Sequence, residues 1–310
     1  MTGTIYYPIS GPPSAGGQHV NVAHVHALVR AGHNAVLLHI PSQDQATDFN
    51  LDAPLLRLET GMKFTEEDTV VLPEPWRVPI EAFAKTPARK IIHCQNPFYI
   101  FHGFDDIRSV RRLGYHEIIT CSEYTTQLLR GFGYDGSIYT VRPAISPEFY
   151  SGGAQTLQIA YMPRKRGVEA VYLQGLFRSL FPEYAAIPWL KIDGCSRAEC
   201  AELLRSSAIF ASFSWYEGLG LPPLEAMASG AIVVGLHGGG GLDYAHDGNG
   251  LWVTEGDYHQ FAHKLAYAVS RFGSAGHAEM QKRAFETAQR YSNSEFEGAL
   301  IRTWGSILGA

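Results

Sequence analysis

The most regular feature of the chain is an alternation of short apolar runs with longer helical stretches. The apolar run Ile5–Ile9 precedes a loop rich in glycine and proline, Ser10–Gly17, and a helical pattern over His19–Ala31 follows. A second apolar run, Ala35–Ile40, completes a unit of strand, loop, helix and strand. Repetition of such units predicts a parallel sheet with helices on both faces.

The same alternation continues to a segment that is typical of a hinge. We expect further strands at residues 70–72, 90–94, 117–121 and 137–141 and a short helix at 124–131. The segment Arg142–Gly153 then contains two prolines and two glycines, as linkers between domains often do. We therefore expect a first domain at residues 1–150 and a second at residues 151–310.

The pattern of strands and helices starts again after this hinge. The expected strands are 157–162, 189–192, 208–212 and 231–235, and the expected helices are 168–181, 197–206, 222–229, 258–272, 277–290 and 294–308. The sequence thus predicts an α/β fold of two tandem Rossmann-like, doubly wound domains. Ligands bind beyond the carboxyl ends of the strands in such sheets, and a cleft between the two domains is the expected site.

Composition and charge exclude several classes of protein. Hydrophobic residues make up 45% and charged residues 18% of the 310 residues, and the net charge is −5. Neither half carries the basic field that nucleic-acid binding requires. The sequence shows no signal peptide and no apolar run of about 18 residues. We expect a cytoplasmic protein with four reduced cysteines and no nucleic-acid partner.

The segment most informative about chemistry is Phe213–Gly230, with the sequence F-S-W-Y-E-G-L-G-L-P-P-L-E-A-M-A-S-G. We expect a buried strand to end near Ser212, Glu217 to lie in a glycine loop, and a helix to begin at the prolines with Glu225 in its first turn. Amide groups of such a loop and helix terminus bind phosphate, and a carboxylate beside them accepts hydrogen bonds from sugar hydroxyls. A tight turn and a favourable helix dipole would explain each feature singly, but their combination is far more specific.

The spacing Glu217-x7-Glu225 resembles the donor-binding motif of retaining glycosyltransferases with the GT-B fold, the large family 4 group. The resemblance covers most of the chain and is strongest over residues 157–257. It extends to a strand followed by basic residues at 159–167, to a glycine loop and strand at 236–253, and to landmarks at 121–124 and 141–145. The chain departs from the pattern where Met162-Pro163-Arg164 replaces the usual Gly-Arg pair.

The resemblance implies roles for the residues of the second domain that match the motif. Glu225 would hold the two ribose hydroxyls of the donor, and Glu217 would bind the transferred sugar. The backbone amides of Gly218 and Leu219 would contact the sugar or the phosphates, in the same loop as Gly220.

The resemblance also implies a set of cations for the donor diphosphate. Lys165, with Arg164 or Arg166, would neutralise the leaving nucleoside diphosphate, which gains charge in the transition state. A solvated turn before a helix is the alternative explanation for these three residues. Which of them contacts the diphosphate stays open at this point.

Three residues of the first domain match the family less closely. Gly16 and Gly17 would let the backbone approach the diphosphate or the sugar, although a pair of glycines also suits an ordinary turn. His93 would lie near the transferred sugar, with a hydrogen-bonded histidine at a strand end as the alternative.

The function implied by this resemblance is transfer of a sugar from a nucleotide-diphosphate sugar, expected to be a UDP- or GDP-sugar, to a carbohydrate, lipid-linked or small-molecule acceptor. Retention of anomeric configuration, independence of metal ions and the lack of a cofactor are further expectations. A nucleotide-sugar 2-epimerase and a non-catalytic sugar-nucleotide scaffold are the alternatives, and the two glutamates and the basic segment argue against both. Peripheral contact with a membrane stays open because Arg108–Gly114 is a small basic run. The last helix, around Phe296–Leu308, is expected to pack back across the domains.

Overall fold

A computed structural model describes residues 3–11, 16–40, 52–150 and 153–309 of the chain. Its contacts divide the chain into two compact units, residues 1–143 with 296–310 and residues 144–295. The boundary expected at residue 150 therefore falls inside the second unit, beside residues 151–152, which lie outside the described part. The carboxyl-terminal segment belongs to the first unit.

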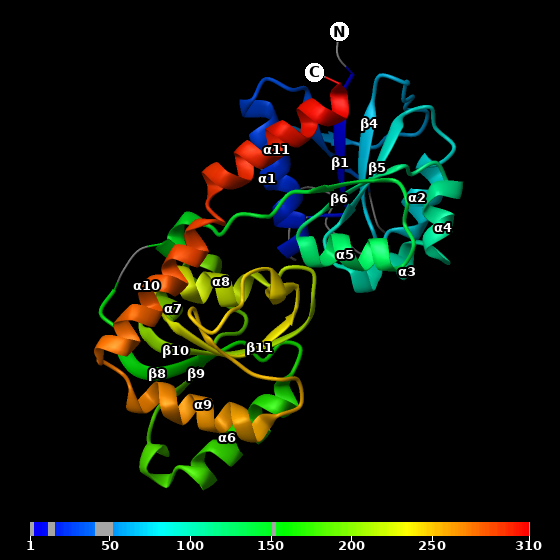
Figure 1. Cartoon of the computed structure of the whole chain (residues 1–310). Helices are drawn as coiled ribbons and strands as arrows, with labels where there is room; N and C mark the ends of the chain where they lie inside the picture. The colour runs from blue at the N-terminus through cyan, green and yellow to red at the C-terminus, as the bar shows by residue number, and fades with distance from the viewer. Residues whose placement is uncertain (1–2, 12–15, 41–51, 151–152, 310) are drawn as a thin grey trace. The chain divides into compact units, whose positions relative to one another are not determined.

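The first unit is built on a parallel sheet of seven strands in the order β3-β2-β1-β4-β5-β6-β7 (Figure 1). The strands are β1 (Ile5–Ile9), β2 (Ala35–His39), β3 (Leu55–Arg57), β4 (Thr69–Pro73), β5 (Arg89–Cys94), β6 (Glu117–Thr120) and β7 (Ser137–Thr140). The strand order reverses between β1 and β4, which is the feature that defines a doubly wound sheet. Ligands of such sheets bind beside this reversal, beyond the carboxyl ends of the strands.

Helices cover both faces of this sheet. They are α1 (Gly16–Arg30), α2 (Arg77–Phe83), α3 (Ile100–Gly103), α4 (Ile107–Arg112), α5 (Glu123–Gly131) and α11 (Asn293–Leu308). The first and last helices, α1 and α11, lie side by side on one face, where Trp304 is fully buried and Arg30 pairs with Glu297 at 2.7 Å (Figure 1). No helix among the described residues is long and apolar enough to cross a bilayer.

The second unit has a parallel sheet of five strands in the order β12-β11-β10-β8-β9. The strands are β8 (Thr156–Tyr161), β9 (Trp189–Lys191), β10 (Ser207–Glu217), β11 (Ile232–Gly239) and β12 (Leu251–Trp252). The helices are α6 (Gly167–Leu180), α7 (Arg197–Arg205), α8 (Leu221–Ala228), α9 (Tyr258–Ser270) and α10 (Ala275–Gln289). Helices α6 and α9 cover one face, and α7, α8 and α10 cover the other (Figure 1). The order reverses between β8 and β10, so these two strands frame the switch point.

Among the boundaries that differ from those expected, three concern predicted site residues. Strand β10 continues to Glu217, because it pairs with β11 as far as Gly239, so Glu217 lies at the end of the strand. Helix α8 begins at Leu221, so Glu225 lies beyond its first turn. Helix α1 begins at Gly16, and residues 12–15 of the expected loop lie outside the described part.

Candidate active site

A lysine and a glutamate meet at the switch point of the second sheet. Lys165 follows β8, Glu217 ends β10, and the two strands are parallel neighbours, so their carboxyl ends lie side by side. The Lys165 Nζ atom is 2.7 Å from Glu217 Oε1 and donates a second hydrogen bond of 3.1 Å to the Trp215 carbonyl oxygen. Both side chains keep about a quarter of their surface exposed, at 25% and 23%. The structure therefore brings together two of the residues that the sequence predicts for the donor site.

The two arginines that flank Lys165 have different environments. The Arg166 side chain is only 4% exposed and forms an ion pair of 2.7 Å with Glu255 and a hydrogen bond of 3.3 Å with the Tyr258 hydroxyl. Arg164 is exposed and forms no hydrogen bond or ion pair with any described residue. The Arg166 side chain therefore stabilises the second unit through these contacts, whereas Arg164 and Lys165 are accessible to a ligand.

Glu225 lies on α8 with its side chain half-buried. Burial raises the pKa of this carboxyl to about 7, and the nearby Arg197 partly opposes the shift. No hydrogen bond from a described residue reaches the side chain. Hydroxyl groups of a ligand would donate hydrogen bonds to this half-buried carboxylate and would stabilise its charged form.

The loop between β10 and α8 packs against a second glycine loop, which follows β11. Gly220 adopts a left-handed φ of 84° at the start of α8, and the Tyr244 hydroxyl donates to its carbonyl oxygen at 2.7 Å. A Cβ atom on Gly240 would lie 2.5 Å from the backbone of Gly218 and Leu219. The glycines after β11 therefore serve close packing, and this packing positions the backbone that is predicted to contact the donor.

His93 lies inside the first unit rather than at its surface. Its ring has no exposed area, its Nδ1 is 2.8 Å from Asn21 Oδ1, and its centroid is 4.7 Å from that of His24. Burial lowers the pKa of His93 to about 3, so the ring is neutral. Its predicted place near the transferred sugar finds no support in this geometry, because no part of the ring is open to a ligand.

The residue beside His93 that reaches the surface is Gln95, which the sequence analysis missed. Its Nε2 atom donates to the carbonyl oxygen of Gly17 at 2.9 Å and to Asn21 Oδ1 at 3.2 Å. Gly17 itself lies in the first turn of α1 next to Gly16, which is exposed. Its position in the sequence could have indicated it, because Gln95 directly follows β5 at the carboxyl edge of the sheet, where ligands bind.

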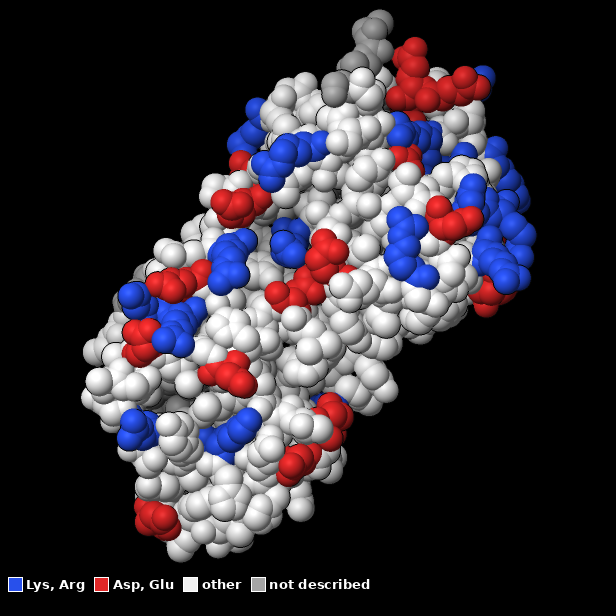
Figure 2. Space-filling view, viewed as in Figure 1, with Lys and Arg blue, Asp and Glu red and all other residues white. Residues whose placement is uncertain are grey.

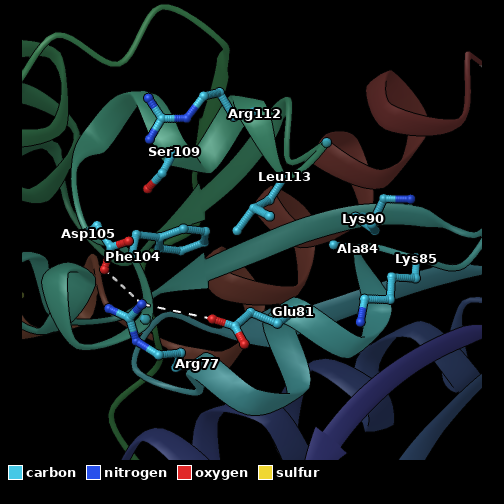
Figure 3. Close-up of a pocket in the computed structure, with 12 residues that line it drawn as sticks. Arg77, Glu81, Ala84, Lys85, Lys90, Phe104, Asp105, Ser109, Arg112 and Leu113 are labelled. Atoms are coloured by element: carbon cyan, nitrogen blue, oxygen red, sulfur yellow. Dashed lines mark hydrogen bonds and ion pairs between the residues drawn. The ribbon is translucent and has the colours of Figure 1, made fainter.

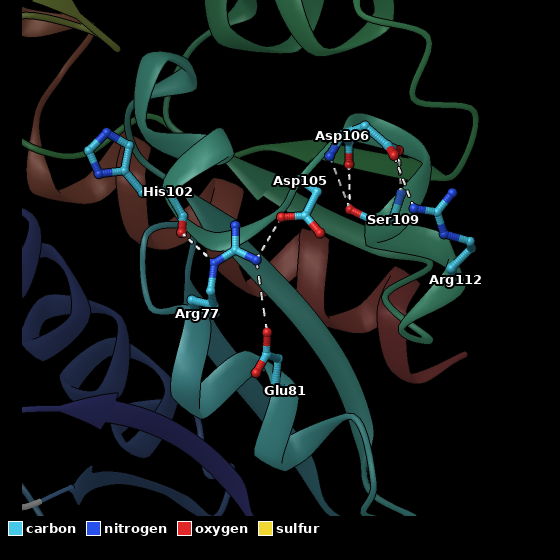
Figure 4. A network of polar contacts seen from close by, with 7 residues as sticks. All are labelled: Arg77, Glu81, His102, Asp105, Asp106, Ser109 and Arg112. Carbon is cyan, nitrogen blue, oxygen red and sulfur yellow. Dashed lines mark hydrogen bonds and ion pairs between the residues drawn. The ribbon is translucent and has the colours of Figure 1, made fainter.

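A hollow in the first unit lies elsewhere and contains none of the predicted site residues. It has a volume of about 680 Å³ and is lined by Arg77, Glu81, Ala84, Lys85, Lys90, Gly103, Phe104, Asp105, Ser109, Arg112, Leu113 and Gly114 (Figure 3). Arg77 contacts Asp105 at 2.8 Å and Glu81 at 3.9 Å, and Arg112 contacts Asp106 at 3.0 Å (Figure 4). The basic side chains that gather over α2 and α4 in Figure 2 are thus interleaved with carboxylates, which weakens any attraction for an anion.

Comparisons with known proteins agree with these features. A model of the family "Glycosyl transferases group 1" matches residues 192–289, which include β10 and α8. An alpha-1,6-glucosyltransferase of Actinobacillus pleuropneumoniae is 31% identical over 312 residues, covering 98% of this chain and 94% of the relative.

Solved structures with much lower identity share the fold. A sucrose-phosphate synthase of Thermosynechococcus elongatus superposes with a TM-score of 0.76 at 14% identity, covering 99% of both chains. HepE of Anabaena, crystallised with UDP-glucose, gives a TM-score of 0.72 at 14% identity and covers 98% of this chain and 99% of its own. Three findings agree: the relative that matches 98% of this chain, the family model over β10 and α8, and the two parallel-sheet units. The chain therefore belongs to the group 1 glycosyltransferases and has their GT-B fold.

Proposed function

We propose that this protein transfers glucose from UDP-glucose to a hydroxyl group of a sugar acceptor, with retention of anomeric configuration. The observation that carries the proposal is the Lys165–Glu217 pair of 2.7 Å at the switch point of the second sheet. The choice of glucose is supported by the relative from Actinobacillus pleuropneumoniae, an alpha-1,6-glucosyltransferase. The choice of UDP is supported by HepE, which was crystallised with UDP-glucose.

In this proposal the donor is bound by groups at the end of β10, in the loop that follows it and on α8. The Glu225 carboxylate accepts hydrogen bonds from the two ribose hydroxyls, which replace the missing donors around it. The amides of Gly218 and Leu219 contact the phosphates or the sugar, in the position that the Gly240 packing fixes. Glu217 accepts a hydrogen bond from a hydroxyl of the glucose ring.

The chemical step requires stabilisation of the leaving UDP. Lys165 exchanges its carboxylate partner for the diphosphate, and the exposed Arg164 supplies a second positive charge. Fixed cations are most effective where charge develops in the transition state, and these two neutralise the diphosphate without requiring a metal ion. The acceptor hydroxyl then attacks the anomeric carbon from the face that UDP leaves and passes its proton to the departing phosphate oxygen. This route of internal return retains the configuration.

The first unit is proposed to bind the acceptor. Gln95 and the first turn of α1 form a polar group at the carboxyl edge of its sheet, beside the reversal between β1 and β4, and buried Asn21 accepts a hydrogen bond from Gln95 at 3.2 Å. Buried His93 is hydrogen-bonded to Asn21 at 2.8 Å, and Asn21 in turn accepts from Gln95, so His93 acts only by holding these two side chains in place. We therefore assign His93 a positioning role.

The experiment is a transfer assay with a defined donor and simple acceptors. The purified protein is incubated with UDP-glucose and with methyl glucoside or short glucose oligomers, UDP release is followed, and the product linkage is read by proton NMR. We expect an α-linked glucose, with loss of transfer in Lys165→Ala and normal transfer in Lys282→Ala, an exposed lysine of α10. A β-linked product would contradict retention, and conversion of the donor to its 2-epimer without acceptor would favour the alternative enzyme.

A further inference from the structure

Two aromatic side chains are exposed where β10 reaches the donor site. The residues of β10 from Ser207 to Ser214 are buried, but Trp215 is 40% exposed and Tyr216 is 51% exposed. Their ring centroids are 4.7 Å apart with an angle of 27° between the planes, so the rings stack. Glu217, the carboxylate of the donor site, is the next residue. Large apolar side chains that are exposed to solvent beside a binding site commonly contact the ligand.

The stacked pair is anchored by the basic segment that follows β8. The Arg166 guanidinium lies 5.1 Å from the centroid of the Trp215 ring, and its ion pair with Glu255 at 2.7 Å keeps it in place. The ammonium group of Lys165 donates to the Trp215 carbonyl oxygen at 3.1 Å. Trp215 is therefore fixed through both its ring and its backbone, and it gives Tyr216 a rigid support.

The backbone of Tyr216 is in a conformation that an aromatic residue rarely adopts. Its φ is 49°, and among the described residues no other non-glycine residue has a positive φ. The pairing of β10 with β11 also shifts register between Ser214 and Glu217, as in the bulges that redirect side chains near active sites. Glycine would adopt this conformation without strain. A tyrosine at this strained position indicates that its ring has a functional contact.

We propose that the Tyr216 ring, supported by Trp215, forms a platform for one face of the glucose ring of the donor. This inference rests on the proposed function. An aromatic face carries partial negative charge and attracts the C–H groups on the flat side of a pyranose, whose hydroxyls point outward to groups such as Glu217. The sugar of the donor is favoured over the uracil because Lys165, the proposed diphosphate ligand, bonds directly to the backbone of this platform.

The test compares the affinities for UDP and UDP-glucose, measured by calorimetry, in wild type and in variants of Tyr216. Tyr216→Ala should weaken UDP-glucose about tenfold and leave UDP within about twofold, because only the sugar loses its contact. Tyr216→Phe should retain the wild-type ratio of the two affinities. The control is Tyr267→Ala, which removes a tyrosine of α9 with similar exposure, 53%, and should change neither affinity.

Three other results would overturn the inference. Equal weakening of UDP and UDP-glucose in Tyr216→Ala would mean that the ring stacks on the base. Unchanged affinity for both ligands would mean that Tyr216 contacts no part of the donor. Wild-type protein that binds neither ligand would overturn the proposed function itself, and that failure is recognised without any variant.

Discussion

Lys165 Nζ and Glu217 Oε1 form a 2.7 Å ion pair between the carboxyl ends of two adjacent parallel strands. In the proposed function, the pair provides a cation for the leaving phosphate and a hydrogen-bond acceptor for the sugar hydroxyls. Each side chain keeps about one-quarter of its surface exposed, so a ligand can reach both members of the pair.

Removal of the cation should impair chemistry more than folding. We expect Lys165→Ala to lower kcat for transfer from UDP-glucose by about 10²–10³-fold, as loss of a preorganised charge typically does. The thermal unfolding temperature should fall only slightly. Steady-state kinetics and a melting curve check both, with Lys282→Ala as the control. A variant that keeps full kcat would show that Lys165 does not act on the leaving group.

The raised pKa of Glu225 predicts a pH dependence of donor binding. The carboxyl titrates at about 7 in the free protein, so below that pH it must lose a proton before it can accept the ribose hydroxyls. Affinity for UDP-glucose should rise with pH and level off above 7, with binding about tenfold weaker at pH 6 than at pH 8. Calorimetry across this range measures the effect. Glu225→Gln should bind more weakly at pH 8 with a flat profile, and an unchanged profile would exclude Glu225 as the titrating group.

The close packing of the two glycine loops predicts that a methyl group added at Gly240 lowers stability and donor binding. Gly240→Ala would place a Cβ atom 2.5 Å from the backbone of Gly218 and Leu219, and the loop must move to relieve that contact. We expect a loss of about 1–3 kcal/mol in stability and more than tenfold weaker binding of UDP-glucose. Gly175→Ala is the control, because its Cβ atom would meet nothing within 4 Å. Unaltered binding in Gly240→Ala would show that the loop backbone does not contact the donor.

The strained backbone of Tyr216 can be measured by comparing two substitutions at the same position. Tyr216→Gly and Tyr216→Ala both remove the ring, but only glycine tolerates a φ of 49° without strain. The glycine variant should be more stable than the alanine variant by about 1–2 kcal/mol. At Tyr267, inside helix α9, the order should be reversed by about 1 kcal/mol. Thermal or urea unfolding of the four variants provides the comparison, and equal stabilities at position 216 would refute the strain.

Much of the fold could be predicted because its strands alternate regularly with helices. The apolar runs within β1, β2 and β10 are continuous, as buried parallel strands require, and the spacing of Glu217 and Glu225 was sufficient to indicate the family. The helices α2, α3 and α4 were missed because they have seven, four and six residues and too few turns to show a period. The extension of β10 depends on its pairing with β11, which local sequence does not reveal.

The details of the site depended on three-dimensional packing. Three consecutive basic residues look alike in sequence, yet Arg166 is buried against Glu255 and Arg164 is exposed. His93 follows the expected strand pattern, but contacts with Asn21 and His24 place it in the core. The conformation of Tyr216 follows from a register shift that no local pattern predicts.

A crystal structure of the protein with bound UDP-glucose would show whether the donor contacts Lys165, Glu217 and Glu225. We expect Lys165 to leave Glu217 for the diphosphate and both ribose hydroxyls to lie within hydrogen-bond distance of the Glu225 carboxylate. We also expect Glu217 to contact the glucose. A donor bound away from these residues, with the 2.7 Å Lys165–Glu217 pair intact, would contradict these expectations.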